Sequence, residues 1–204
     1  MPRGLLRLTA PLGFGILHVA PAITPFLAQY PEMRVDMVLD DRILDLVEGG
    51  FDMAIRCGGL GGASTHLVRR LATKDVVVCA SPAYLARRGE PRTPADLAAH
   101  DTLVHPYYPE GDSWEFAGPT GPVTVRLAAR YSSNNALALR AAALEGGGIV
   151  RLASFFVSDD LAAGRLVRVL TRYRLPRIDI HAVYPNRAYV PRSEEHTSEL
   201  QSPI

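Results

Sequence analysis

The sequence has few cysteines and nearly balanced charges. Two of the 204 residues are cysteine, Cys57 and Cys79, and they form no C-x-x-C pair. Two cysteines are too few for a disulfide framework or a cysteine-based zinc module. We therefore predict that both are reduced and buried. The formal net charge is +1, with no block of lysine and arginine. The chain therefore lacks the basic footprint of a nucleic-acid-binding surface.

Signals for membrane insertion, export and catalysis are also missing. No uninterrupted run of about 18 apolar residues occurs, and the amino end lacks the pattern of a secretory signal. The sequence contains no G-x-S-x-G, no H-E-x-x-H and no phosphate-binding loop, because the glycine-rich stretch 58–62 has no following lysine. We therefore expect a cytoplasmic protein that is not an enzyme, with no cofactor, no metal and no membrane partner.

The residues that are present predict an α/β protein. Hydrophobic residues make up 48% of the chain and charged residues 21%, which is enough for one or two compact units. The central stretch is 48–58, where two glycines end a helix-like segment, an apolar strand follows, and Arg56 lies at the carboxyl end of that strand. Ligands bind at this end of the strands in open α/β sheets.

The first half of the chain predicts the order β-α-β-α-β. Alternation and spacing of apolar residues predict strands at 5–9, 34–39 and 51–56, with helices at 16–30 and 43–49 between them. Pro21 and Pro25 should kink the first helix or mark its first turns. Because this order implies parallel strands with right-handed crossovers, we expect a cleft along their carboxyl ends.

The second half predicts a further set of alternating elements. A strongly β-forming run at 76–80 leads into a short helix that begins at Ser81, and Thr93 with Pro94 starts another helix. Asn134 or Asn135 should cap a helix that ends at the glycines 146–148. The remaining predictions are strands at 102–105, 149–152, 166–170 and 178–183, a peripheral hairpin of 114–116 with 123–127, and a helix at 155–163.

Several stretches, taken in this order, resemble one family. They are 5–11 (LLRLTAP), 26–31 (FLAQYP), 45–56 (DLVEGGFDMAIR), 79–85 (CASPAYL), 139–143 (LRAAA) and 181–185 (HAVYP). Over residues 4–192 the chain resembles the effector-binding domain of LysR-type transcriptional regulators. That resemblance implies a periplasmic-binding-protein type II-like fold of two α/β lobes joined by two crossover strands, with lobe I at 4–80 plus 178–192 and lobe II at 81–177.

The resemblance also implies a function and partners. A small-molecule effector enters the cleft between the lobes of a homodimer, or of a higher oligomer in the full-length protein, and changes how attached heads bind DNA. The first helix would pack against lobe II of the other subunit. The winged helix-turn-helix and the closing helix of the family are not in the sequence, and residues 193–204 resemble a translated sequencing adapter, so we expect a fragment with a disordered tail. The alternative is a solute-binding protein of a transporter.

Ten residues are candidates for ligand binding in the predicted cleft. Two helix amino ends, near Gly15 and Asn135, should point N–H groups into it and favour an anion such as a carboxylate. Arg56 either holds that carboxylate or pairs with Asp40 or Asp52. The full set is Thr9, Ala10, Pro11, Asp40, Arg56, Cys57, His105, Ser133, Asn134 and Asn135.

Overall fold

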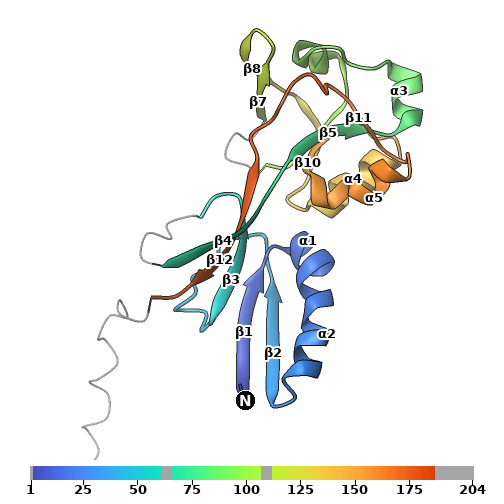
Figure 1. Cartoon of the computed structure of the whole chain (residues 1–204). Helices are drawn as coiled ribbons and strands as arrows, with labels where there is room; N and C mark the ends of the chain where they lie inside the picture. Colours follow the sequence, from blue (N-terminus) through green and yellow to red (C-terminus); the bar gives the residue numbers. More distant parts are fainter. Residues whose placement is uncertain (1, 61–65, 107–111, 187–204) are drawn as a thin grey trace, which may run out of the picture.

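The chain folds into two five-stranded sheets that meet at a narrow waist (Figure 1). The computed structural model describes residues 2–60, 66–106 and 112–186. Within these ranges the strand orders are β2-β1-β3-β12-β4 and β11-β5-β10-β6-β9, and a two-stranded sheet, β7-β8, lies beside the second. We call the first sheet with its attached segments lobe I, and the second lobe II.

Lobe I is built on parallel strands. β1 (Gly4–Ala10) lies between β2 (Met33–Leu39) and β3 (Met53–Cys57), and both pairings are parallel, as predicted. β12 (Ile178–Tyr184) inserts antiparallel between β3 and β4 (Leu67–Lys74). The last described strand of the chain therefore completes the sheet that the first strand begins.

Lobe II has helices on both faces of its sheet, and the hairpin covers one of these faces. Its sheet contains β5 (Val76–Ala80), β6 (Thr102–Val104), β9 (Ala129–Ser132), β10 (Ile149–Ala153) and β11 (Val167–Arg168). α4 (Ala136–Leu144) and α5 (Ser154–Ala162) pack on one face. The other face meets α3 (Pro82–Arg88), the 3-10 helix η3 (Pro94–Ala99) and the hairpin of β7 (Ser113–Gly118) with β8 (Gly121–Arg126).

The predicted helix caps are confirmed. Ser81 Oγ accepts the N–H of Tyr84 at the start of α3. Thr93 and Asp96 form a capping box at η3, and Asn135 Oδ1 accepts the N–H groups of Leu137 and Ala138 at the start of α4. Local side-chain chemistry thus fixes where these helices begin.

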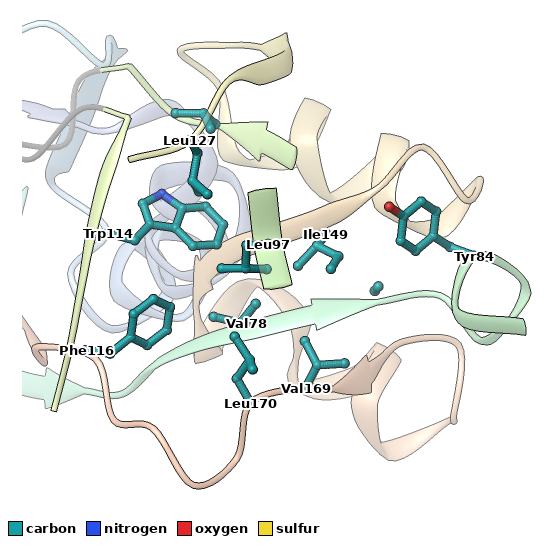
Figure 2. Packing of buried hydrophobic residues seen from close by; sticks show 11 residues of the cluster. Val78, Tyr84, Leu97, Trp114, Phe116, Leu127, Ile149, Val169 and Leu170 are labelled. Carbon is teal, nitrogen blue, oxygen red and sulfur yellow. The ribbon is translucent and has the colours of Figure 1, made fainter. Parts of the chain in front are cut away.

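The hairpin is part of the lobe II core, although we predicted it to be peripheral. Trp114 is 1% exposed and Phe116 is also buried. Figure 2 shows both rings against side chains from other elements, among them Val78 of β5 and Leu97 of η3. The hairpin therefore closes this face of the sheet.

The chain crosses between the lobes twice. It leaves lobe I at Asp75, between β4 and β5, and returns through residues 175–177 into β12. An ion pair of 2.9 Å between Arg177 Nε and Asp75 Oδ1 joins the two crossing segments. Because β5 pairs within the lobe II sheet, we place the first crossing at Asp75 and not after Ala80, where we had predicted the lobe boundary.

The first helix has three parts. α1 (Leu12–Phe14) leads into the π-helical segment η1 (Gly15–Val19) and then α2 (Ala20–Gln29), with Pro21 in the first turn of α2 and Pro25 inside it. By length and composition alone, this helical stretch could also span a membrane, although it contains no uninterrupted run of about 18 apolar residues. Phe14 and Val19 pack against the lobe I sheet, so one side of the helix belongs to the core.

Two sequence predictions about elements were wrong. Residues 43–49 are irregular and then form turns from 46, not a helix, because Asp45 Oδ1 accepts the N–H of Glu48 and the Leu44 carbonyl accepts a bond from Arg56. Those two backbone groups would bond each other in a helix. The strand predicted at 166–170 is paired only as β11, since Leu170 turns the chain away with a positive φ of 55°.

Candidate functional site

A cleft of about 1160 Å³ lies between the lobes. Lobe I supplies four of its segments, which are the start of the first helix, the turn after β2, the end of β3 and the first half of β12. Lobe II and the crossing segments supply the rest. The lining residues are Pro11, Gly13, Phe14, 40–43, 56–60, Val76, His105, Ala136, Arg151, Phe155, Phe156 and 175–179, with His181.

Five of the predicted site residues meet in this cleft. They are Pro11, Asp40, Arg56, Cys57 and His105. Thr9 and Ala10 are buried in β1 and do not line the cleft. Ser133, Asn134 and Asn135 also lie outside its lining. Asn135 caps α4, and Ser133 Oγ accepts the Asn135 N–H.

Three N–H groups at the two helix amino ends that we predicted to bind an anion have partners within the protein. The N–H of Leu12 donates to Asp41 Oδ1 over 2.9 Å, and the first N–H groups of α4 donate to Asn135. At these two positions the N–H groups of Leu12, Leu137 and Ala138 are therefore already bonded within the protein. α5 begins without a side-chain cap, and its first residues include Phe155 and Phe156, which line the cleft.

Arg56 bonds a backbone carbonyl and not Asp40. Its side chain is 8% exposed, and its guanidinium donates to the Leu44 carbonyl over 2.7 Å. Burial lowers the pKa of Arg56 from its ordinary value, which still leaves an arginine charged. Asp40 pairs instead with Arg42, at 2.7 Å, and this partner lowers the pKa of Asp40.

Cys57 lies in the cleft as a protonated thiol. Burial, with the nearby charge of Asp41, raises the pKa of Cys57 to about 12. Burial also raises the pKa of Cys79 to about 12. Both cysteines are free, and thiols with such pKa values are weak nucleophiles at neutral pH.

Two titratable side chains of the cleft, one from each lobe, interact through their charges. Asp41 belongs to the turn after β2 in lobe I, and His105 follows β6 in lobe II. Burial raises the pKa of Asp41 and lowers the pKa of His105, and the charge of each partially opposes the effect of burial on the other. Arg151 adds to the lowering at His105.

The lowered pKa of His105 predicts a loss of stability in mild acid. The folded protein binds this proton less readily than the unfolded chain, so the free energy of unfolding should fall as the pH drops through about 6.5, the ordinary pKa of histidine. Burial lowers the pKa of His100 as well, so both histidines act in the same direction. We expect unfolding midpoints in urea at pH 7.5 and 5.5 to differ less in His105→Gln than in the parent chain.

The double variant His105→Gln/His100→Gln should lose still less stability between pH 7.5 and 5.5, because burial lowers the pKa of both histidines. If the difference between the two unfolding midpoints is as large in His105→Gln as in the parent chain, or larger, protonation of His105 does not cause the loss of stability in acid.

Arg151 is a cleft residue that the sequence analysis missed. It lies in the middle of β10, is 6% exposed, and places its guanidinium carbon 5.3 Å from the centre of the Trp114 ring. In the sequence it stands inside an apolar run, 149–153, that predicts only a core strand. An arginine within such a run was the available signal, since a buried charge requires a partner.

His181 is a second missed residue. It lies opposite Arg56 in the pairing of β12 with β3, and opposite Arg70 in the pairing of β12 with β4. Its Nδ1 is buried and makes no hydrogen bond within the described part of the chain. These basic side chains form one row across the lobe I sheet. No group of three metal-ligating side chains converges in residues 2–60, 66–106 and 112–186.

Comparison with known proteins identifies the family. The LysR substrate binding domain matches residues 1–199. The transcriptional regulator PtxR of Pseudomonas aeruginosa is 36% identical over 190 residues, covering 93% of this chain and 61% of PtxR. The activator TtdR of Escherichia coli is 35% identical, covering 92% of this chain and 60% of TtdR.

A solved structure agrees over nearly the whole chain. The regulatory domain of CrgA from Neisseria meningitidis superimposes with a TM-score of 0.81 and 28% identity, and the match covers 94% of each chain. The present chain spans about 60% of the length of the curated relatives. It belongs to the LysR family of transcriptional regulators as a substrate-binding domain with a periplasmic-binding-protein type II-like fold.

Proposed function

We propose that the chain senses a small, carboxylate-bearing effector in the interlobe cleft and transmits its presence to a DNA-binding part of the full-length regulator. The observation that carries the proposal is a pair of buried arginines in one cleft, Arg56 from lobe I and Arg151 from lobe II. A guanidinium in a site of low polarity binds carboxylates strongly and with defined geometry. The cleft is large enough for a small organic molecule.

The acidic residues of the cleft are compatible with such a ligand. Asp40 is neutralised by Arg42, and Asp41 accepts the Leu12 N–H. Asp179 accepts from the Thr73 hydroxyl and lies 3.8 Å from Arg70. Because a carboxylate has more than one acceptor position, Asp41 can also accept from a hydroxyl or amine group of the effector.

Signal transmission in this proposal needs both lobes and a second subunit. An effector held between lobes stabilises one interlobe angle over others. Apolar side chains on the outside of the first helix support a homodimer, since Ile16 is 46% exposed and Leu17 is 39% exposed. We assign this apolar surface to a subunit contact in the cytoplasm and not to a membrane.

DNA contact belongs, in this proposal, to a helix-turn-helix region outside the present residues. The curated relatives are named as helix-turn-helix regulators and are longer than this chain. Those relatives support regulation over the alternative of a transporter's solute-binding protein, and over catalysis.

A ligand screen with two matched variants tests the proposal. Small mono- and dicarboxylic acids should raise the unfolding temperature of the parent chain in a saturable way, because a ligand that binds the folded state stabilises it. For an acid that does so, Arg56→Gln should weaken binding roughly tenfold, the effect of losing one hydrogen bond to a charged group. Asn135→Ser should bind normally, since it lies outside the cleft lining and serine retains the cap.

Two results would count against this site. An equal loss of affinity in Arg56→Gln and Asn135→Ser would mean that the acid does not bind at the Arg56 wall. The absence of saturable stabilisation by any carboxylate would remove the proposed ligand class.

A further inference from the structure

A second groove, of about 450 Å³, lies beside the crossing segments in lobe II. We call it the hinge groove. It shares only Val76, Leu175 and Arg177 with the interlobe cleft. One wall is the start of β5 and the other is the chain that returns toward lobe I. The lining residues are Asp75, Val76, Val77, Val78, Arg168, Val169, Leu170, Thr171, Tyr173, Arg174, Leu175 and Arg177.

The backbone opens this groove by leaving the sheet early. β11 pairs with β5 through Val167 and Arg168, and Val169 then donates its N–H to the Val78 carbonyl over 3.0 Å. Leu170 follows in the left-handed region, with a φ of 55°. This conformation costs a bulky residue on the order of 1 kcal/mol, and it directs the chain away from β5.

The returning chain is then fixed against the hairpin. The N–H of Arg174 donates to the Ala117 carbonyl over 3.0 Å, and the N–H of Ala117 donates to the Arg174 carbonyl over 2.7 Å. The N–H of Tyr173 donates to the Leu170 carbonyl, which closes the turn between them. Both walls of the groove are therefore held by backbone bonds, and the space between them does not depend on side-chain positions alone.

The charge of the groove is strongly one-sided. Three arginines line it, Arg168, Arg174 and Arg177, against the single carboxylate of Asp75. Asp75 pairs with Arg177. Neither Arg168 nor Arg174 forms an ion pair with any residue that the structure describes. Thr171 and Tyr173 also line the groove.

We propose that the hinge groove is a second ligand site, for a small oxyanion with two or more negative charges. Its volume is within the usual range for small-molecule sites, roughly 300–1,000 Å³, and arginine forks match the geometry of phosphate and carboxylate oxygens. Its walls come from both crossing segments, so an anion in the groove bridges Arg168 and Arg174 of lobe II to Arg177 on the way back to lobe I. Binding here is thermodynamically coupled to binding in the interlobe cleft through the angle between the lobes.

Titration with sodium pyrophosphate at constant ionic strength tests this site. Isothermal calorimetry on the whole chain should give saturable binding, and Arg168→Gln/Arg174→Gln should weaken it roughly tenfold or more, because two charge-assisted contacts are lost. Arg172→Gln is the matched control, since Arg172 is exposed in the same turn but does not line the groove. It should bind pyrophosphate as the parent chain does.

Three outcomes would overturn the proposal. The first is an absence of saturable pyrophosphate binding to the parent chain. The second is a double variant that binds pyrophosphate as tightly as the parent, and the third is an Arg172→Gln variant that loses as much affinity as the double variant. A further variant, Arg151→Gln, separates the hinge groove from the cleft. Loss of pyrophosphate binding in Arg151→Gln, with binding retained in Arg168→Gln/Arg174→Gln, would place the anion in the cleft and reject the hinge groove.

Discussion

Replacing Trp114 by alanine is expected to lower the free energy of unfolding by about 3–5 kcal/mol, the usual effect of deleting a buried aromatic ring. Trp114 is 1% exposed and packs in the core that joins the hairpin to β5 and η3 (Figure 2). The alanine also removes the ring beneath the Arg151 guanidinium. Since many domains are stabilised by only about 5–15 kcal/mol, this single change should leave lobe II close to unfolding.

Urea denaturation followed by circular dichroism measures this loss, because the variant has no tryptophan left to report by fluorescence. Glu115→Ala is the matched control, since Glu115 is the next residue of β7 and is exposed. It should change the free energy of unfolding by no more than about 0.5 kcal/mol. Similar losses in the two variants would mean that the hairpin is not anchored through its inner face.

Replacing Arg151 by glutamine is expected to weaken effector binding by roughly two orders of magnitude, because truncating one partner of a buried charge pair costs about 2–5 kcal/mol. Arg151 is the cleft arginine supplied by the lobe II sheet, so its replacement should remove the charged contact between the effector's carboxylate and lobe II.

The fluorescence of Trp114 can follow this binding directly. It is the only tryptophan in the sequence, and its ring lies beneath the Arg151 guanidinium. A carboxylate that reaches Arg151 should alter the emission of the parent chain, with a dissociation constant obtained by titration. Arg126→Gln, a change at an exposed arginine outside the cleft lining, should leave that constant unaltered. Parent-like affinity in Arg151→Gln would exclude Arg151 as an effector contact.

Sequence patterns predicted the elements whose determinants are local. The alternation in 34–39 and the β-forming run 76–80 correspond to β2 and β5. The caps at Ser81 and Asn135 depend on a side chain and the backbone two or three residues away, and both were predicted correctly. The failed helix at 43–49 shows the limit of local patterns. Its spacing of apolar residues was helical, but the carbonyl that a helix needs was bonded by Arg56, twelve residues later in the chain.

The candidate site was less predictable because it depends on the pairing of strands that are far apart in the sequence. Arg56 and His181 are opposite each other only through the pairing of β12 with β3. Arg151 lines the cleft because β10 lies between β5 and β6 in the lobe II sheet. Neither arrangement follows from spacing along the chain. Asp40, Cys57 and His105 were found in advance because each lies at the end of a predicted strand, where ligand sites of α/β sheets occur.

The position of β12 has a consequence for how the chain folds. Lobe II is formed by one continuous segment, whereas the lobe I sheet has β12 between β3 and β4, which are more than a hundred residues earlier in the chain. During synthesis lobe II can therefore assemble first, while the edges of β3 and β4 that pair with β12 are still unpaired. Until β12 emerges from the ribosome, two strand edges that are paired in the finished protein remain open to wrong partners, which makes lobe I the more vulnerable half of a nascent chain.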